Sequence, residues 1–226
     1  MTAFPFAIVG FDLDGTLLDT AGDLAAAVDH ALASEGRPPL GVDRVRPMIG
    51  GGARHMLAQG LTAAGVEPDA PTLDRLVPIL LAYYEANIAV QTRPFAGAMA
   101  AVEDLASRGV RVAIVTNKVQ RLAAQVLGAL GIADRFDCVI GGDTLGPGRG
   151  KPAPDPILEM IHRCGGGRAA FVGDSIYDTQ AARAAGVPSV AVSFGFLMEP
   201  IEELGADAVI NSYAELVPTL DRLGRG

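Results

Sequence analysis

Short apolar runs alternate with stretches of helical periodicity along most of this chain, and this alternation constrains the fold more than any other feature. The runs are rich in β-branched residues and bounded by Gly, Asp or Pro, as strands buried on both faces of a sheet are. Strands that alternate with helices predict a doubly wound α/β fold, in which helices cover both faces of a parallel sheet. The predicted strands span residues 6–11, 110–115, 138–140, 169–172, 189–192 and 208–210, and the predicted helices span residues 98–107, 119–129, 155–164, 179–185 and 213–223.

The segment 19–93 interrupts this alternation. It contains no convincing strand, and apolar residues such as Leu24, Val28 and Leu32 recur in it at helical spacing. Thr20 is suited to cap the first of these helices, together with Asp23 three residues further on. We therefore predict two domains: an α/β core of residues 1–18 and 94–226, and an inserted helical domain of residues 19–93.

The charge and hydropathy of the chain exclude several classes of partner. The 226 residues include 26 Asp and Glu against 18 Lys and Arg, a net charge of -8, with no long basic run that would bind nucleic acid. The apolar stretch at residues 3–11 is far shorter than the ~20 residues that span a bilayer, and no basic region of a signal peptide precedes it. We expect a cytoplasmic protein that binds neither nucleic acid nor membranes.

Two aspartates, Asp12 and Asp14, follow the first predicted strand, and Gly15 allows the chain to turn directly after them. Such a pair can coordinate a hard cation, and it can also divide the roles of nucleophile and proton donor. The alternative is a plain turn, because Asp-Gly is a common turn pair in which the Asp only caps the next segment. Polar residues elsewhere in the chain therefore decide whether the pair is a site.

Three further motifs follow predicted strands or their loops. Thr116, in the run Val-Thr-Asn-Lys at 115–118, places a hydroxyl at a predicted helix start, which suits phosphate oxygens as well as a simple cap. Lys151 offers a fixed cation that can neutralise a phosphoryl group. Asp174 and Asp178 form a second acidic pair, which indicates a metal. Because ligands of such sheets bind at the carboxyl ends of the strands, the four motifs together predict a phosphoryl-transfer site.

With these motifs in this order, the sequence resembles the haloacid dehalogenase-like hydrolases, whose core is Rossmann-like, and within them the phosphoglycolate phosphatases. The helical insert is similar to the cap domain of that family. The resemblance implies that Asp12 attacks phosphorus to give an aspartyl phosphate, while Asp14 protonates the departing alkoxide and then activates water. The residues that carry it are Asp12-Leu13-Asp14-Gly15-Thr16, Thr116, Lys151 and the stretch from Gly173-Asp174 to Asp178.

The same resemblance implies a cofactor, Mg²⁺, and a small phosphate ester as substrate, above all 2-phosphoglycolate. The ion would be bound by the carboxylates of Asp12 and Asp174 and the backbone carbonyl of Asp14. Asp178 would support the metal site or orient the Lys151 side chain. The phosphate would be held by Thr116, Asn117 and Lys151.

The inserted segment offers one candidate substrate contact. Three glycines at 50–52 precede a predicted helix and leave backbone amides accessible to an anion, and Arg54 could pair with a substrate carboxylate. The alternative is a flexible turn that leaves Arg54 in solvent.

Two other function classes stay open. A phosphosugar mutase shares all four motifs, although its relatives carry a different cap loop, so the glycine run at 50–52 counts against it. A noncatalytic binding module on the same fold is disfavoured because no expected carboxylate, Lys or Thr is missing. Nothing in the sequence predicts the oligomeric state.

Overall fold

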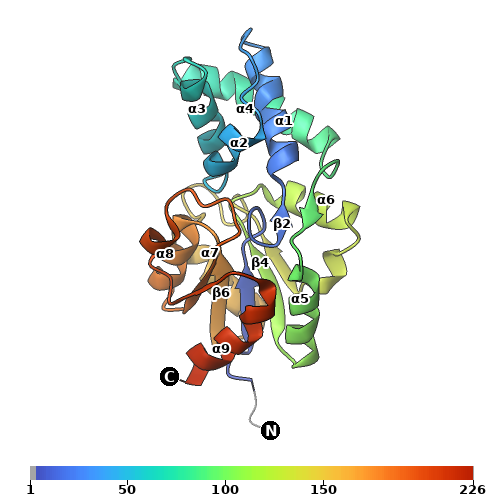
Figure 1. Ribbon diagram of the computed structural model, residues 1–226, viewed down its shortest axis with the longest axis vertical. Coiled ribbons are helices and arrows are strands. Elements are labelled where there is room, and N and C mark those ends of the chain that lie inside the picture. The colour runs from blue at the N-terminus through green and yellow to red at the C-terminus, as the bar shows by residue number, and fades with distance from the viewer. Residues whose placement is uncertain (1–3, 226) are drawn as a thin grey trace.

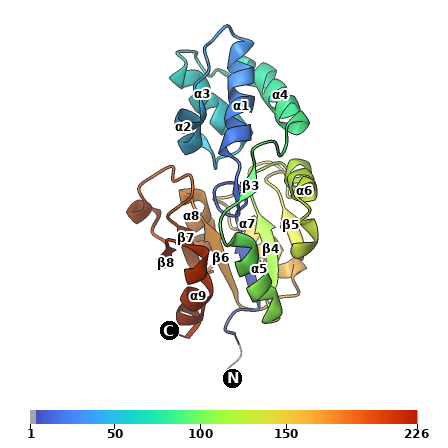
Figure 2. The ribbon, with the colours of Figure 1, turned by 45° about the vertical axis from the view of Figure 1, so that its right-hand side comes forward.

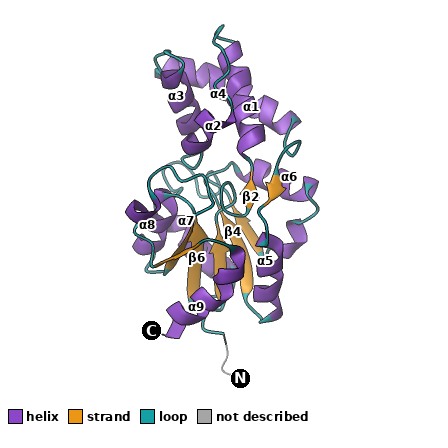
Figure 3. Cartoon of the chain, viewed as in Figure 1, coloured by secondary structure: helices purple, strands orange, loops and turns teal. Residues whose placement is uncertain are grey.

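In the computed structural model, which describes residues 4–225, six parallel strands form one sheet in the order β5-β4-β1-β6-β7-β8 (Figures 1 and 2). All six predicted strands are present, and the predicted doubly wound α/β fold is confirmed. Most of their residues are buried, because helices cover both faces of the sheet (Figure 3). The strands are β1 (Ile8–Phe11), β4 (Arg111–Val115), β5 (Cys138–Ile140), β6 (Ala169–Gly173), β7 (Ser189–Val192) and β8 (Ala208–Ile210).

Alternate residues of the strands serve two hydrophobic cores. In β1, Val9 and Phe11 pack into the core shared with α5 (Ala98–Ser107), α6 (Gln120–Ala129) and α9 (Leu216–Arg225). Ile8 points to the opposite face and into the core shared with α7 (Asp155–Arg163) and α8 (Ile176–Ala184). This alternation follows from the two-residue period of a strand.

Two predicted helix starts were wrong. Helix α8 begins at Ile176 instead of residue 179, because the Asp178 carboxylate accepts hydrogen bonds from the Ser175 amide and hydroxyl and so fixes the first turn. The last helix is preceded by a 3₁₀ turn at Tyr213–Glu215 and begins only at Leu216.

The segment between β2 (Leu18–Asp19) and β3 (Arg93–Pro94) is helical, and β2 and β3 pair in a two-residue antiparallel ladder that was not predicted. The helices stand together above the sheet, at the end opposite to both chain termini (Figure 1). Their role as a separate domain stays a prediction. We call them the inserted helices: α1 (Ala21–Ala33), α2 (Val42–Val45), α3 (Ala53–Ala63) and α4 (Ala70–Ala86). Within residues 4–225, no helix combines the length and the apolar character needed to cross a membrane.

The predicted cap of the first inserted helix is wrong. Thr20 occupies the cap position of α1, but its buried hydroxyl has no hydrogen-bond partner among the described residues. The Asp23 carboxylate turns instead toward the far end of the insert. There it accepts hydrogen bonds from the Gln91 amide at 3.0 Å, the Thr92 amide at 2.9 Å and the Thr92 hydroxyl at 2.7 Å. Asp23 therefore joins the two segments that connect the insert to the sheet.

Candidate active site

The predicted site residues gather at the carboxyl ends of three neighbouring strands. Strand β1 lies between β4 and β6, and Asp12, Thr116 and Asp174 directly follow these three strands. The backbone continues the sheet for one more step, since the Asp12 amide donates to the Val172 carbonyl at 2.9 Å. All three side chains are buried. This arrangement arises because the strands are parallel and end at the same edge of the sheet.

Lys151 lies between two of the predicted carboxylates. Its ammonium is 2.9 Å from Asp12 Oδ1 and donates to Asp178 Oδ1 at 2.5 Å, and the side chain is 1% exposed. Burial works to lower the pKa of Lys151, but the two carboxylates outweigh it and raise the pKa above its usual range. Lys151 is therefore a fixed positive charge beside Asp12.

Asp12, Asp174 and Asp178 form a buried acidic cluster in which one carboxylate oxygen of each lies within 4.8 Å of the others. Burial raises the pKa of Asp12 to about 6, with the charges of Asp178 and Asp14 adding to the effect and Lys151 opposing it. Burial, then Asp178 and Asp12, raise the pKa of Asp174 as well. Among residues 4–225, Asp12 Oδ1 has no hydrogen-bond partner, although it forms an ion pair with Lys151.

This donor set fits a divalent cation. Three carboxylates face a single ammonium, so ionised carboxylates would leave negative charge unbalanced, and oxygen ligands are those that Mg²⁺ prefers. The unpartnered oxygen of Asp12 also offers a free ligand atom. The residues present therefore fit a divalent cation, whereas the assignment of Asp12, Asp14 and Asp174 as its ligands stays a prediction. Asp178 is hydrogen-bonded to Lys151.

The loop after β1 closes tightly on Asp174. Its Oδ1 accepts a hydrogen bond from the Thr16 hydroxyl at 2.9 Å, and its Oδ2 accepts one from the Phe196 amide at 2.8 Å. Gly15 has a positive φ of 83°, and a Cβ there would lie 2.2 Å from Asp174 Oδ2. Only glycine fits this position, which explains the Asp-Gly turn noted in the sequence.

Lys118 is a site residue that the sequence analysis did not assign. Its ammonium donates to both carboxylate oxygens of Asp14 at 3.0 Å, and it lies 4.4 Å from the ring centre of Tyr84 in α4. Burial works to lower the pKa of Lys118, but the Asp14 carboxylate outweighs it and raises the pKa. The only signal in the sequence was that Lys118 stands two residues after Thr116, in the run 115–118 at the end of a predicted strand.

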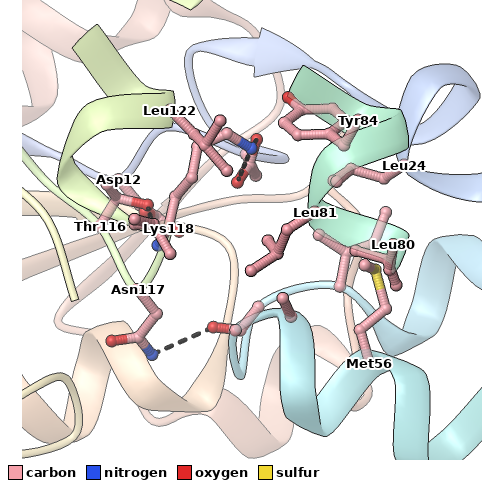
Figure 4. A pocket seen from close by; sticks show the side chains of 16 residues that line it. Asp12, Leu24, Met56, Leu80, Leu81, Tyr84, Thr116, Asn117, Lys118 and Leu122 are labelled. Atoms are coloured by element: carbon pink, nitrogen blue, oxygen red, sulfur yellow. Dashed lines mark hydrogen bonds and ion pairs between the residues drawn. The ribbon is translucent and has the colours of Figure 1, made fainter. Parts of the chain in front are cut away.

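A pocket lies between the carboxyl end of the sheet and the inserted helices (Figure 4). Its polar end is formed by Asp12, Asp14, Thr116, Asn117 and Lys118. Apolar side chains of α1, α3 and α4 form the opposite wall, and they include Leu24, Met56, Leu80 and Leu81. Gly50 and Gly52 also line the pocket, so the predicted glycine run does reach it.

Asn117 lies in the pocket, but its side chain is already engaged. The amide nitrogen Nδ2 donates to the Gly50 carbonyl at 3.1 Å and to the Lys151 carbonyl at 3.0 Å. The side chain thus joins the inserted segment to the loop that carries Lys151. A phosphate contact by Asn117 would therefore have to come from its backbone amide.

Unlike the other predicted site residues, Arg54 belongs neither to the pocket lining nor to the acidic cluster around Lys151. Its guanidinium pairs with the Asp74 carboxylate at 2.6 Å, with half of the Arg54 side chain exposed. It is absent from the pocket lining, although its neighbour Ala53 is part of it. The expected substrate contact of Arg54 has no support in this arrangement.

Several known proteins are similar to this chain in sequence and in fold. The model of the haloacid dehalogenase-like hydrolase family matches residues 6–186. Phosphoglycolate phosphatases of Caulobacter vibrioides and Agrobacterium fabrum are 43% and 38% identical to this chain, over 93% and 96% of its length and 89% and 92% of theirs. The crystal structure of a predicted phosphoglycolate phosphatase from Haemophilus somnus 129pt matches with a TM-score of 0.87 and 29% identity, over 97% of this chain and 99% of that one. The chain therefore belongs to the haloacid dehalogenase-like hydrolases, and within them to the phosphoglycolate phosphatase family.

Proposed function

We propose that this protein is a Mg²⁺-dependent phosphatase that hydrolyses 2-phosphoglycolate through an aspartyl phosphate on Asp12. The observation that carries the proposal is the position of Asp12, which lines the pocket and lies 2.9 Å from the buried Lys151 ammonium. A nucleophile beside a fixed cation is what phosphoryl transfer needs. The names of the relatives support phosphoglycolate as the substrate.

The roles of the side chains follow from their places. A carboxylate oxygen of Asp12 attacks phosphorus, and the bond from phosphorus to the ester oxygen breaks. Asp14, which lines the same pocket, gives its proton to the departing alkoxide. In the second half of the reaction it takes a proton from the water that attacks the aspartyl phosphate. Thr116 and Lys151 hold the phosphate oxygens, and the Lys151 ammonium neutralises their charge.

Mg²⁺ would be held by the carboxylates of Asp12 and Asp174 and by the backbone carbonyl of Asp14. Asp178 supports the site through its hydrogen bond with Lys151 and through the Asp174 amide, which donates to Asp178 Oδ2 at 3.2 Å. The bound ion supplies positive charge that stabilises the transferring phosphoryl group.

The inserted helices act as the cap of this site. Residues 19–93 form the cap domain in this proposal, and residues 1–18 and 94–226 form the core domain. Support comes from the pocket, whose catalytic end belongs to the sheet and whose apolar wall belongs to the helices. Such a wall excludes water from the reacting groups and suits a small ester.

Phosphate release tests the proposal. Phosphoglycolate, pyrophosphate, sugar phosphates and nucleotides are each incubated with the protein in Mg²⁺ and in EDTA. We expect release from phosphoglycolate in Mg²⁺ above all, no release in EDTA, and a loss of at least about 10³-fold in Asp12→Asn. Circular dichroism checks that this variant is folded. Near-normal hydrolysis by pure Asp12→Asn would overturn the assignment, and positional isomers without phosphate release would identify a mutase.

A further inference from the structure

One cation at the pocket has not been assigned a substrate contact in the proposed reaction. Of the described residues that line the pocket, Lys118 carries the only positive charge, since neither Lys151 nor Arg54 is part of the lining. Lys118 is tied to Asp14, yet an ammonium has three donors and can bind a second acceptor at the same time.

A hydroxyl beside Lys118 is also free to bind a ligand. Tyr84 is 1% exposed and lines the pocket, and its hydroxyl has no hydrogen-bond partner within residues 4–225. Burial raises the pKa of Tyr84, so the hydroxyl keeps its proton and can donate it. A buried hydroxyl without a partner costs free energy, and a ligand group that accepts its hydrogen bond would offset this cost.

Lys118 and Tyr84 reach the same end of the pocket from different parts of the chain. Lys118 follows β4 of the sheet, whereas Tyr84 belongs to the inserted helix α4 (Figure 4). Apart from Asp14, which Lys118 binds, the pocket wall beside them is apolar, with Leu24, Leu80 and Leu81 on the side of the inserted helices. An anion placed against that wall can accept hydrogen bonds from this pair, and the low dielectric of the surroundings strengthens the attraction.

We propose that Lys118 and Tyr84 form a carboxylate subsite that selects phosphate esters of short hydroxy acids. It rests on the proposed function: the phosphoryl group lies at Asp12 while the carboxylate of the same molecule binds the Lys118 ammonium and the Tyr84 hydroxyl. An ester without the carboxylate leaves both donors without that acceptor, and such a loss discriminates strongly between substrates. In this proposal, Lys118 and Tyr84 bind the substrate carboxylate that Arg54 was expected to bind.

Two esters that differ at the carboxylate test the subsite. We compare kcat/KM for phosphoglycolate with kcat/KM for 2-hydroxyethyl phosphate, in Mg²⁺. We expect the wild type to prefer phosphoglycolate, and Tyr84→Phe to reduce this preference about tenfold through a higher KM. Tyr83→Phe is the matched control, since Tyr83 neighbours Tyr84 on α4 but does not line the pocket.

Lys118→Met separates substrate binding from the effect of Lys118 on Asp14. Loss of the ion pair with Asp14 slows both esters alike, whereas loss of the subsite slows phosphoglycolate more. We expect the preference for phosphoglycolate to fall about 10²-fold or more. Arg54→Ala serves as the control cation and leaves the preference unchanged.

Binding of stable analogues gives a second measurement that needs no turnover. The phosphonate 3-phosphonopropionate carries the carboxylate and propylphosphonate lacks it, and calorimetry in Mg²⁺ gives both dissociation constants. We expect the wild type to bind the first more tightly, and Tyr84→Phe and Lys118→Met to lose this difference.

The outcomes distinguish the two proposals. A wild type without preference for the carboxylate, or an unchanged preference in Tyr84→Phe, overturns the subsite even if phosphoglycolate is hydrolysed. No phosphate release from any ester overturns the proposed function, and the phosphonates then still decide whether the pair binds a carboxylate. If Lys118→Met fails to fold, Tyr84→Phe decides alone.

Discussion

The Asp23 carboxylate accepts hydrogen bonds from both the amide and the hydroxyl of Thr92, which lies 69 residues further along the chain. Both residues are buried, and they stand where the chain enters and leaves the inserted segment. A third bond comes from the Gln91 amide. This one carboxylate therefore holds together the two connections of the insert to the sheet, beside the ladder of β2 and β3.

Loss of the Asp23 carboxylate should lower the stability of the folded protein. Asp23→Ala leaves two buried or half-buried amides and one hydroxyl without an acceptor, and we expect the free energy of unfolding to fall by about 2–4 kcal/mol. Asp23→Asn keeps one acceptor oxygen and should lose about half as much. Urea unfolding measures both. An Asp23→Ala protein as stable as the wild type would show that these bonds do not secure the insert.

The raised pKa of Asp12 predicts that ionisation of this carboxyl lowers the free energy of unfolding of the metal-free protein, by an amount that depends on pH. The folded protein holds this proton more tightly than the unfolded chain does. The cost is therefore absent below the unfolded pKa of about 4, grows as pH rises, and is complete above the folded pKa of about 6. In EDTA, Asp12→Asn should be more stable than the wild type by about 1–3 kcal/mol at pH 7.5. At pH 5 this gain in stability should be smaller by about 1 kcal/mol.

Urea unfolding at the two pH values measures this difference. Mg²⁺ should stabilise the wild type at pH 7.5, because it binds the folded protein and balances the carboxylates, and should stabilise Asp12→Asn much less. A gain in Asp12→Asn that is equal at both pH values would contradict the assigned cause, since a packing effect does not depend on this proton.

The ion pair of Arg54 with Asp74 should contribute little. Half of the Arg54 side chain and 69% of the Asp74 side chain are exposed, and exposed pairs typically stabilise by less than about 1 kcal/mol. Arg54→Ala should leave the KM for phosphoglycolate unchanged and lower the unfolding free energy only slightly. Steady-state kinetics check this against Asp74→Ala. A tenfold rise in KM for Arg54→Ala alone would restore Arg54 as a substrate contact.

The sheet could be predicted because its strands are buried on both faces and therefore read as apolar runs with clear ends. The same ends marked Asp12, Thr116 and Asp174, because strand order in a parallel sheet brings such positions together. Local features were less certain. Asp23 matched a helix-capping pattern, but its carboxylate found three donors at the far end of the insert, which no local pattern contains.

Lys118 and Tyr84 show why part of the site could not be predicted. In the sequence, Lys118 follows Thr116 and Asn117 with no acidic neighbour, and Tyr84 fits the apolar stripe of a helix. Their importance depends on the packing of α4 over the loop after β4, which brings the Lys118 ammonium to 4.4 Å from the Tyr84 ring centre. Arg54 presents the reverse case: its position after the glycine run suggested a substrate contact, but its side chain pairs with Asp74 instead.

Tyr84→Phe should raise stability even though it weakens substrate binding. The variant removes a buried hydroxyl that has no partner within residues 4–225, and it keeps the ring that packs beside Lys118. We expect a gain of about 1 kcal/mol, which for a chain of this length raises Tm by about 2–4 °C. Tyr83→Phe should change neither stability nor substrate preference. Thermal unfolding without ligand, in EDTA, measures both variants. A clear loss of stability in Tyr84→Phe would mean that the hydroxyl is satisfied in the free protein, and the premise of the carboxylate subsite would be wrong.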